Sequence, residues 1–471
     1  MRVTTFVIFI YFSGLHFLFS QTCITGSVTF NTQAEVNSFV STYSSSGCKS
    51  IGGDLRISGT GLSLTGLSFL DTIKGILRLE PTGATAISVN LTGLTGLDKI
   101  NSLKVRKITN SSLTTINISS FSGYIEIRDC DNLQQFNFIP AAVLTNTVSS
   151  MIISNCPVLF GLTSLNSLQV CSSFQLSNTG IINYTLPASF HTATTSFYIS
   201  GNQGLVTLSI PNTNFTTPTL TMTNNKKATT FSLNIGTSEN ITINDSLNSL
   251  TILNPSATQN FDILSLKLPK MTSLAFLSNI NTVKDLRIEF NGTTLNELTN
   301  IDSLEKLTLE NCPNLTTFGG LHPDIFHLNT LKIQNCASLL NMAGFSQISQ
   351  IGYLNYQNIG FGSLILTNNA LLNSVQHLNT FDIYSATVTG NPNLNFCCRL
   401  NSISWPQYSN ISNNGTPCNS FTNLATYCVD SDQDGIINYL IIVPQMLISI
   451  SSTPIRTESE MCVMPVQFQS I

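Results

Sequence analysis

The sequence predicts an all-β solenoid of about fifteen coils, in which short parallel strands stack along most of the chain. A strand with apolar residues at alternate positions recurs through residues 55–388. Between strands, apolar residues recur at every third position, as at Leu295, Leu298, Ile301 and Leu304. That spacing differs from the 3.6-residue period of an α-helix and fits extended or 3₁₀-like sides.

Each repeat has the pattern apolar-x-apolar, so one face of every strand points inward and the other outward. Thirteen of the fourteen spacings between successive strands lie between 21 and 26 residues. The exception is a 33-residue gap, which we interpret as an insertion around Gly352 to Gly362. The first apolar positions are Leu55, Leu77, Leu103, Ile125, Met151, Phe174, Phe197, Leu220, Ile241, Leu264, Leu286, Leu307, Leu331, Leu364 and Ala386.

A turn signal follows the strands, such as Ser-Asn-Cys at 154–156 and Ser-Gly-Asn at 200–202. Asn and Gly suit tight corners, and a buried Asn can hydrogen-bond the backbone of neighbouring coils. Cys130, Cys156, Cys312 and Cys336 take the same place in their repeats. We therefore expect a fixed inward corner occupied by Cys or Asn.

Both open ends of the solenoid are predicted to be covered. Thr32 to Glu35 forms a capping box, and Val36, Phe39 and Val40 give the following short helix an apolar face within an N-terminal cap at 22–50. The solenoid itself is assigned to 51–395, and a cysteine-rich C-terminal cap containing Trp405 to 396–428. The disulfide candidates at these ends are Cys23, Cys48, Cys397, Cys398, Cys418 and Cys428.

Residues 1–21 have the layout of a cleavable secretory signal. A largely apolar run from Phe6 to Phe19 follows Met-Arg and closes with Ser20, so cleavage is expected next to Gln21. The run falls short of the roughly 20 apolar residues that a membrane span needs. We expect a secreted or extracellular cell-surface protein, in which disulfides can persist.

The composition limits the classes of partner. Only 9% of the 471 residues are charged, against about 25% in ordinary soluble domains. This weakly charged surface has no basic stripe to neutralise phosphates, which disfavours a nucleic-acid partner. The tail at 440–471 has no assigned role, and its apolar run from Tyr439 to Ile450 is too short for a transmembrane segment. We expect a monomer that binds a glycan or protein ligand.

Several segments resemble the receptor L-domain-type repeats of bacterial surface proteins. They are the runs 28–39 and 47–57, the Leu-x-x-Leu-x-Leu-x-x-Cys pattern of 304–312, and the end stretch 391–398 with 417–420. The resemblance implies a right-handed parallel β-helix of leucine-rich-repeat type and a role in recognition or adhesion. It covers Cys23 to Cys428 and names no ligand.

A second resemblance concerns 429–439, which is similar to one thrombospondin type 3 calcium repeat. Asp430, Asp432, Asp434 and Asn438 supply oxygen ligands, and a Gly follows Asp434 where a calcium loop turns. An EF-hand is disfavoured because its twelfth position is Ile441, which has no carboxylate. The motif predicts a calcium site, with a solvated acidic turn as the alternative.

One row of carboxylates raises an enzymatic alternative. Glu289 and Glu310 share a strand position in successive repeats, and the nearby Arg287 and Lys332 are candidates to hold an acid group of the substrate. Two acids one coil apart suit a polysaccharide-cleaving enzyme, provided that one has a raised pKa. The simpler interpretation is a row of outward polar residues on the strands.

The favoured interpretation is a non-catalytic recognition or adhesion module that presents a rigid solenoid face. It depends on the repeats, the export signal and the lack of a recognisable catalytic set. Tyr124 and Tyr198 are candidate aromatic contacts for a sugar ring, and the alternative is that each packs against a neighbouring loop.

Overall fold

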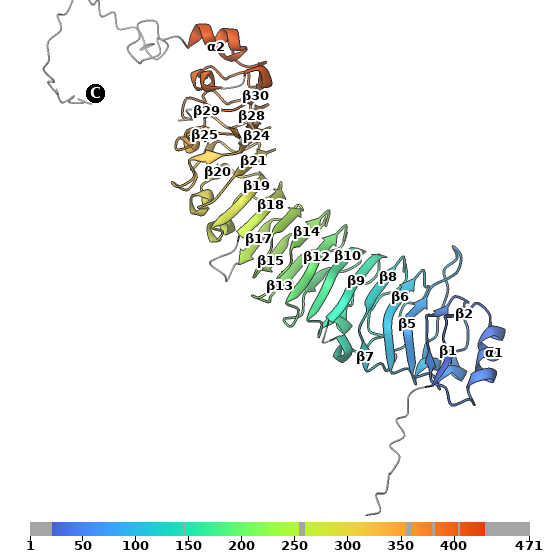
Figure 1. Ribbon diagram of the computed structural model, residues 1–471. Helices are drawn as coiled ribbons and strands as arrows, with labels where there is room; N and C mark the ends of the chain where they lie inside the picture. Colours follow the sequence, from blue (N-terminus) through green and yellow to red (C-terminus); the bar gives the residue numbers. More distant parts are fainter. Residues whose placement is uncertain are drawn as a thin grey trace, which may run out of the picture.

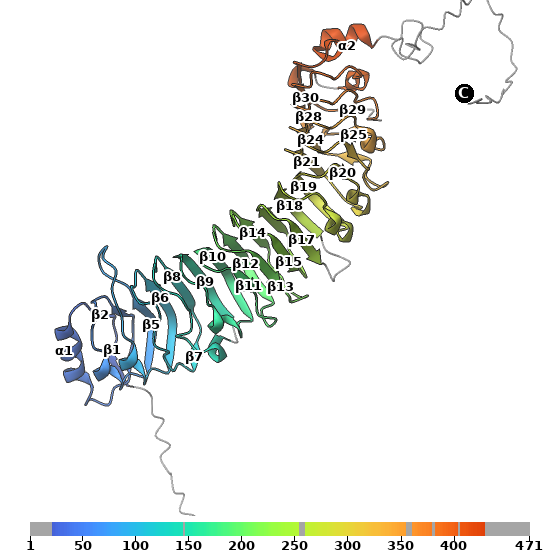
Figure 2. The same cartoon turned by 180° about the vertical axis from the view of Figure 1, so that it is seen from behind.

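The computed structural model describes residues 21–144, 147–253, 260–354, 360–378, 382–403 and 406–428. It is an elongated, curved stack of coils, with the helix α1 (Gln33–Tyr43) at one end and α2 (Phe421–Tyr427) at the other (Figure 1). The view from behind shows the same unbroken stack (Figure 2). The predicted all-β parallel solenoid with a short N-terminal capping helix is therefore confirmed.

One long parallel sheet runs the length of the molecule, and we call it the main sheet. All fifteen predicted first apolar positions are register partners in it, from the Leu55–Leu77 pair to the Leu364–Ala386 pair. One further strand joins at each end, in the segments interpreted as caps. Its strands are β2 (Val28–Phe30), β4 (Leu55–Ile57), β5 (Thr72–Leu79), β6 (Lys99–Arg106), β8 (Tyr124–Arg128), β9 (Thr147–Cys156), β10 (Val170–Thr179), β12 (Thr192–Ser200), β14 (Thr219–Thr223), β16 (Asn240–Asn244), β18 (Asn260–Leu268), β19 (Thr282–Phe290), β21 (Lys306–Glu310), β24 (Thr330–Gln334), β28 (Leu364–Thr367), β30 (Ala386–Thr389) and β31 (Asn410–Ser412).

The other sides of the coils vary with composition. Leucine-rich coils form short 3₁₀ turns, in which every third residue is buried, as at Leu64, Leu67 and Leu70. The Thr- and Asn-rich coils instead form a second parallel sheet, because β-branched Thr favours the extended backbone. That sheet contains β11 (Asn183–Thr185), β13 (Thr207–Ile210), β15 (Thr230–Asn234) and β17 (Ser249–Leu253).

The remaining elements are short. β1 (Thr22–Ile24), β3 (Ser50–Ile51) and β7 (Ser120–Phe121) pair beside the first coils, and β20 (Thr294–Leu295) pairs with β22 (Thr317–Phe318). β23 (His327–Leu328), β25 (Gln350–Ile351) and β29 (Asp382–Ile383) form a three-stranded sheet. The antiparallel pair β26 (Tyr353–Leu354) and β27 (Gly360–Phe361) lies within the predicted insertion. The 3₁₀ helices are η1 (Thr65–Leu67), η2 (Thr92–Leu94), η3 (Ala141–Leu144), η4 (Thr163–Leu165), η5 (Ala275–Asn279), η6 (Glu297–Asn300), η7 (Ala343–Phe345), η8 (Cys398–Ser402), η9 (Pro406–Tyr408) and η10 (Thr416–Cys418).

Buried asparagines bind successive coils together at the inward corner. The side chain of Asn225 accepts hydrogen bonds from the backbone N–H and the amide of Asn202, each at 3.1 Å, and donates to Ile199 O and to Asp245. Asn369 and Asn391 repeat the arrangement near the C-terminus. Both backbone and side-chain groups are thereby satisfied without water.

Cysteines take the same corner where asparagine is absent. Cys130, Cys156, Cys312 and Cys336 are buried with free thiols, and Cys156 donates to Ser154 O at 3.3 Å. The thiol is small enough for this close-packed position and still finds a carbonyl acceptor. The predicted inward corner is thus occupied by a buried Cys in some coils and by a buried Asn in others.

The N-terminal cap buries the first coil beneath α1. The Thr32 hydroxyl accepts from Glu35 N, and the Glu35 carboxylate accepts from the backbone N–H groups of Asn31 and Thr32. These hydrogen bonds lower the pKa of Glu35 below its ordinary value. Phe39 lies on Phe30 of the first coil, with ring centroids 5.5 Å apart.

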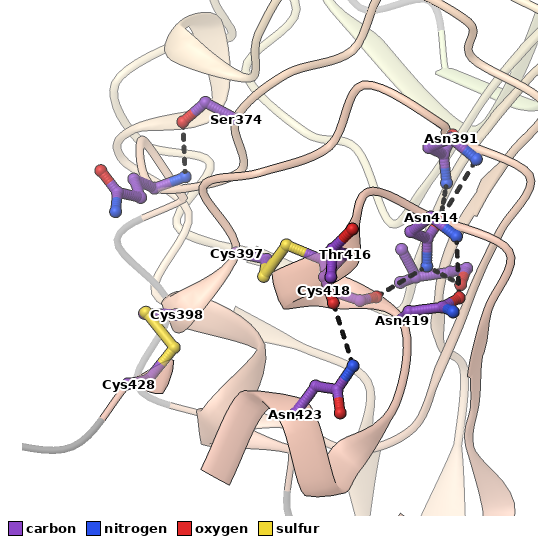
Figure 3. Close-up of a disulfide and its surroundings, with 12 residues drawn as sticks. Ser374, Asn391, Cys397, Cys398, Asn414, Thr416, Cys418, Asn419, Asn423 and Cys428 are labelled. Carbon is purple, nitrogen blue, oxygen red and sulfur yellow. Dashed lines mark hydrogen bonds between the residues drawn. A yellow bond between two sulfur atoms is a disulfide. The ribbon is translucent and has the colours of Figure 1, made fainter. Parts of the chain in front are cut away.

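The C-terminal cap closes the other end with α2 and two disulfides. Cys397 bonds to Cys418, and Cys398 to Cys428, while Cys23 bonds to Cys48 at the N-terminal end. Asn414 donates to Val388 O at 2.7 Å and so continues the buried ladder into the cap (Figure 3). Trp405 lies outside the described residues.

Candidate functional site

The outward side chains of the main sheet form continuous columns, because every strand is paired in parallel and in the same register. Arg56, Arg78 and Lys104 are successive partners in one column, and Gln175, Tyr198 and Thr221 continue it further along. Each strand contributes three such outward positions, immediately before, between and after its two inward residues. We call this surface the outer face.

The first stretch of the outer face, on β4 to β8, is highly charged for so neutral a chain. Its outward residues are Asp54, Arg56, Ser58, Ile76, Arg78, Glu80, Ser102, Lys104, Arg106, Tyr124, Glu126 and Arg128. Burial alone would raise the pKa of Asp54, but a hydrogen bond from the backbone N–H of Ile76 and the Arg78 guanidinium 2.8 Å away together lower it. Tyr124 is half-buried here, and burial raises its pKa.

The middle stretch, on β9 to β16, has no charged side chain at any of its outward positions. These are Ser150, Ile152, Ser154, Ser173, Gln175, Ser177, Ser196, Tyr198, Ser200, Thr219, Thr221, Thr223, Asn240, Thr242 and Asn244. The hydroxyls of Ser173 and Ser196 lie 3.0 Å apart, so they form a hydrogen bond across strands. We call this surface the neutral face.

Tyr198 is the one aromatic residue of the neutral face, and it lies on the central strand β12. Its neighbours in register are Gln175 and Thr221, so an amide and a hydroxyl flank the half-buried ring. Beneath β12, Phe174 and Phe197 stack with centroids 4.9 Å apart, and Phe215 meets Phe197 edge-on. The close-packed rings give the face a rigid floor.

A hollow of about 520 Å³ lies beside the neutral face, at the beginning of β12. Thr192, Thr216 and Thr237 stack there through parallel bridges, and the Thr216 hydroxyl donates to Thr192 Oγ1 at 3.3 Å. Glu239 also lines the hollow. Its walls therefore offer hydroxyl oxygens, methyl groups and one carboxylate, which suit a polar ligand without negative charge. Sequence reasoning missed it because its residues are about 20 positions apart.

The last stretch of the outer face contains the two glutamates considered for catalysis. Following the pairing of Ile288 with Leu309 by one residue places Glu289 beside Glu310, as predicted. Glu289 accepts a hydrogen bond from Asn311 at 3.2 Å, and Glu310 lies 3.5 Å from Lys332 Nζ. The Glu310 side chain is 34% exposed, so solvent rather than a closed cavity surrounds it.

The Arg287 guanidinium is already bonded to a carboxylate and is not free to bind an acid group of a substrate. Its guanidinium forms a double contact with Asp285, at 2.7 and 3.1 Å, and that contact raises the pKa of Arg287. Both cations named as possible substrate contacts, Arg287 and Lys332, are thus paired with carboxylates of the same sheet.

Other predicted features fall outside the described residues. These are the signal sequence, the calcium motif with Asp430, Asp432, Asp434 and Asn438, and the tail. Within the described ranges no group of three or more His, Cys, Asp or Glu residues is placed to hold a metal ion. Nor does that part of the chain contain a helix that is long and apolar enough to cross a bilayer.

Comparisons with known proteins give structural neighbours only. No family model and no curated protein matches the sequence. A leucine-rich repeat protein from Bacteroides eggerthii aligns over 72% of this chain and 66% of its own, with 10% identity and a TM-score of 0.36. One from Bacteroides thetaiotaomicron aligns over 72% and 49%, with 10% identity and a TM-score of 0.32. The chain thus spans two thirds or less of the length of these proteins, and the fold assignment rests on its own strand pairing.

Proposed function

We propose that this chain is a secreted or cell-surface recognition module that binds glycans on its neutral face. The observation that carries the proposal is the absence of charge from three outward positions on each of five neighbouring strands, with Tyr198 on the central one. Elsewhere on the main sheet the same columns contain clustered ion pairs.

The chemistry of the neutral face fits a sugar chain. A pyranose ring has an apolar face that stacks on an aromatic side chain, and a rim of hydroxyls that pair with hydroxyl and amide groups. Tyr198 supplies the ring, while Gln175 and Thr221 supply polar groups on either side of it. Because the sheet is fixed by its core, these groups are preorganised and lose little conformational entropy on binding.

The proposal assigns no catalytic step to the chain. Glu289 and Glu310 are adjacent but engaged by Asn311 and Lys332 on an open surface. If the native chain cleaved a polysaccharide and Glu310→Gln abolished the cleavage, the hydrolase alternative would replace this proposal.

Binding of the purified full chain to a panel of immobilised neutral glycans tests the proposal. Tyr198→Ala is expected to weaken the binding of a captured glycan roughly tenfold, which corresponds to about 1.4 kcal/mol. Thr387→Ala, in the same column at the far end of the sheet, is the matched control and is expected to change nothing. The proposal is contradicted if no glycan of the panel binds, or if Tyr198→Ala and Thr387→Ala weaken binding equally. If the chain instead captures a partner protein and Tyr198→Ala abolishes that capture, a protein replaces the glycan as the ligand.

A further inference from the structure

A second hollow, of about 290 Å³, lies where the strands of the charged stretch end. It exists because the coil after β5 is long: 26 residues separate Leu77 from Leu103, and residues 82–86 project into solvent. The hollow is lined by Arg56, Glu80, Pro81, Thr82, Gly83, Lys104, Arg106 and Lys107. We call it the cationic hollow.

Positive charge exceeds negative charge in the cationic hollow. Four of its lining residues are cations and one is an acid, Glu80, which is 8% exposed. The Glu80 carboxylate lies 3.4 Å from Lys104 Nζ, 3.6 Å from the Arg78 guanidinium and 3.9 Å from Arg56 Nε, so three cations share it. Arg106 pairs with Asp129 at 3.0 Å, outside the lining. An anion entering the hollow would therefore meet an unbalanced field from partly desolvated cations.

Part of this charge is held in place by the backbone. The Arg56 guanidinium donates to the carbonyl oxygens of Glu80 and Pro81, which fixes it at the wall of the hollow. An arginine fixed in this way presents its remaining N–H groups in a defined geometry, as recognition of a carboxylate or sulfate requires.

Lys107 provides an independent observation. Nine non-glycine residues of the described chain have positive φ, and the other eight are Asn or Asp, which tolerate the left-handed region. Lys107, at φ 50°, occupies the corner that Asn155 and Asn178 occupy in later coils. A lysine costs stability in this conformation, and such local costs concentrate at functional sites. No salt bridge of the described residues involves its ammonium group.

We propose that the cationic hollow binds a sulfate or carboxylate group of an acidic glycan. The inference deepens, and rests on, the proposed glycan function of the neutral face, which begins on the strand after β8. A nucleic acid would require cations along its whole track, and the neutral face supplies none. A chain of sugars with an occasional anionic group fits both surfaces, because its hydroxyls meet the neutral face and its anion meets the hollow.

The test measures affinity of the full chain for heparin, polygalacturonate and neutral dextran at several salt concentrations. Lys107→Asn installs the residue that this corner usually carries, so it should fold at least as well and yet bind acidic glycan about tenfold more weakly. Glu80→Gln removes the competing carboxylate and should bind acidic glycan several-fold more tightly, although it leaves cations unneutralised. Lys306 is an exposed cation on the same sheet. Its replacement, Lys306→Gln, is the control and should change the affinity for none of the three polymers.

The outcomes separate the two proposals. If Lys107→Asn and Glu80→Gln leave binding of both acidic polymers unchanged, or if Lys306→Gln weakens it equally, the cationic hollow is not the site. Suppose that Lys107→Asn weakens and Glu80→Gln strengthens the binding of acidic polymers, while Tyr198→Ala changes the binding of no glycan. In that case the hollow binds anions and the neutral face does not bind sugars. Loss of acidic-glycan binding at all salt concentrations in Tyr198→Ala alone would reject the hollow and support the neutral face.

Discussion

Replacing Asn225 with alanine should be among the most damaging single substitutions in the solenoid. Asn225 is fully buried, and its side chain makes four hydrogen bonds that join three coils. The change leaves an amide N–H and a side-chain amide of Asn202, the carbonyl of Ile199 and one oxygen of Asp245 without these partners. Each such buried group costs about 1 to 3 kcal/mol, so we expect a loss of roughly 4 kcal/mol or more.

The matched control is Asn178→Gly, on the solvent side of the same corner. The Asn178 side chain donates one exposed hydrogen bond, to Asn155 Oδ1 at 3.0 Å, and glycine adopts its positive φ of 51° without strain. We therefore expect this change to cost less than about 1 kcal/mol.

Urea unfolding at neutral pH measures both variants, with hydrogen exchange as a local readout. In Asn225→Ala the Asn202 amide, which donates to Asn225 Oδ1 at 3.1 Å, should exchange faster than in the native chain. If Asn225→Ala destabilises the protein no more than Asn178→Gly, the buried ladder does not hold the coils together, and apolar stacking alone must do so.

Two further predictions concern buried titratable groups. Burial raises the pKa of Asp245 above its ordinary value, so its charged form costs stability at neutral pH, and that cost disappears as the pH falls through the raised pKa. Asp245→Asn should stabilise the protein at pH 7 by about 1 kcal/mol in thermal or urea unfolding. The two proteins should be equally stable once the pH is below 3.8, the ordinary pKa of an aspartate. A difference in stability that does not change with pH would contradict this prediction. Besides the four corner cysteines, Cys171 is also a buried free thiol, and Cys462, which lies outside the described residues, is replaced by serine to exclude its thiol from the measurement. In this Cys462→Ser variant, the five buried free thiols should not react with Ellman's reagent at pH 8 until denaturant is added, since burial raises the pKa of Cys171 to about 12 and shields all five. A count of one thiol in denaturant would instead show that the cysteines of neighbouring coils are bonded in pairs.

The main sheet could be predicted from sequence because each coil repeats the same local requirement. Phe174 and Ala386 differ greatly in size, yet both occupy the first inward position, because alternation and spacing define it rather than residue type. The capping helix was equally readable, since the Thr32 and Glu35 pair is a local signal. Both predictions depended on contacts within a few residues or on a fixed repeat.

The remaining sides of the coils could not be predicted in this way. The expectation of 3₁₀-like sides holds at Leu67, but between Asn183 and Leu253 a second parallel sheet replaces them. Whether a Thr-rich segment extends depends on the segments above and below it, with which it must pair. Asp245 shows the same limit: its role as the end of a buried amide ladder follows from stacking on Asn225, 20 residues away.

The candidate sites were hidden from sequence for a related reason. Each outward residue is unremarkable alone, and the neutral face and the cationic hollow arise only when residues 21 to 26 positions apart align in columns. Alternation predicted that Glu289 and Glu310 would be neighbours, and they are, but not that Asn311 and Lys332 would engage them. Spacing alone therefore overstated the catalytic potential of the glutamate pair. It also gave no indication of Lys107, which stands out only by its positive φ.

The ladder that stabilises the coils also explains how a flat surface can be selective. Asn202 and Asn225 fix the height and rotation of successive coils, and the outward columns of β10, β12 and β14 inherit that order. Without deep pockets, selectivity on such a face must come from the sequence of polar, aromatic and charged positions along it. A disturbance of the buried ladder near Tyr198 should consequently weaken ligand binding as well as stability, because the two properties share one set of hydrogen bonds.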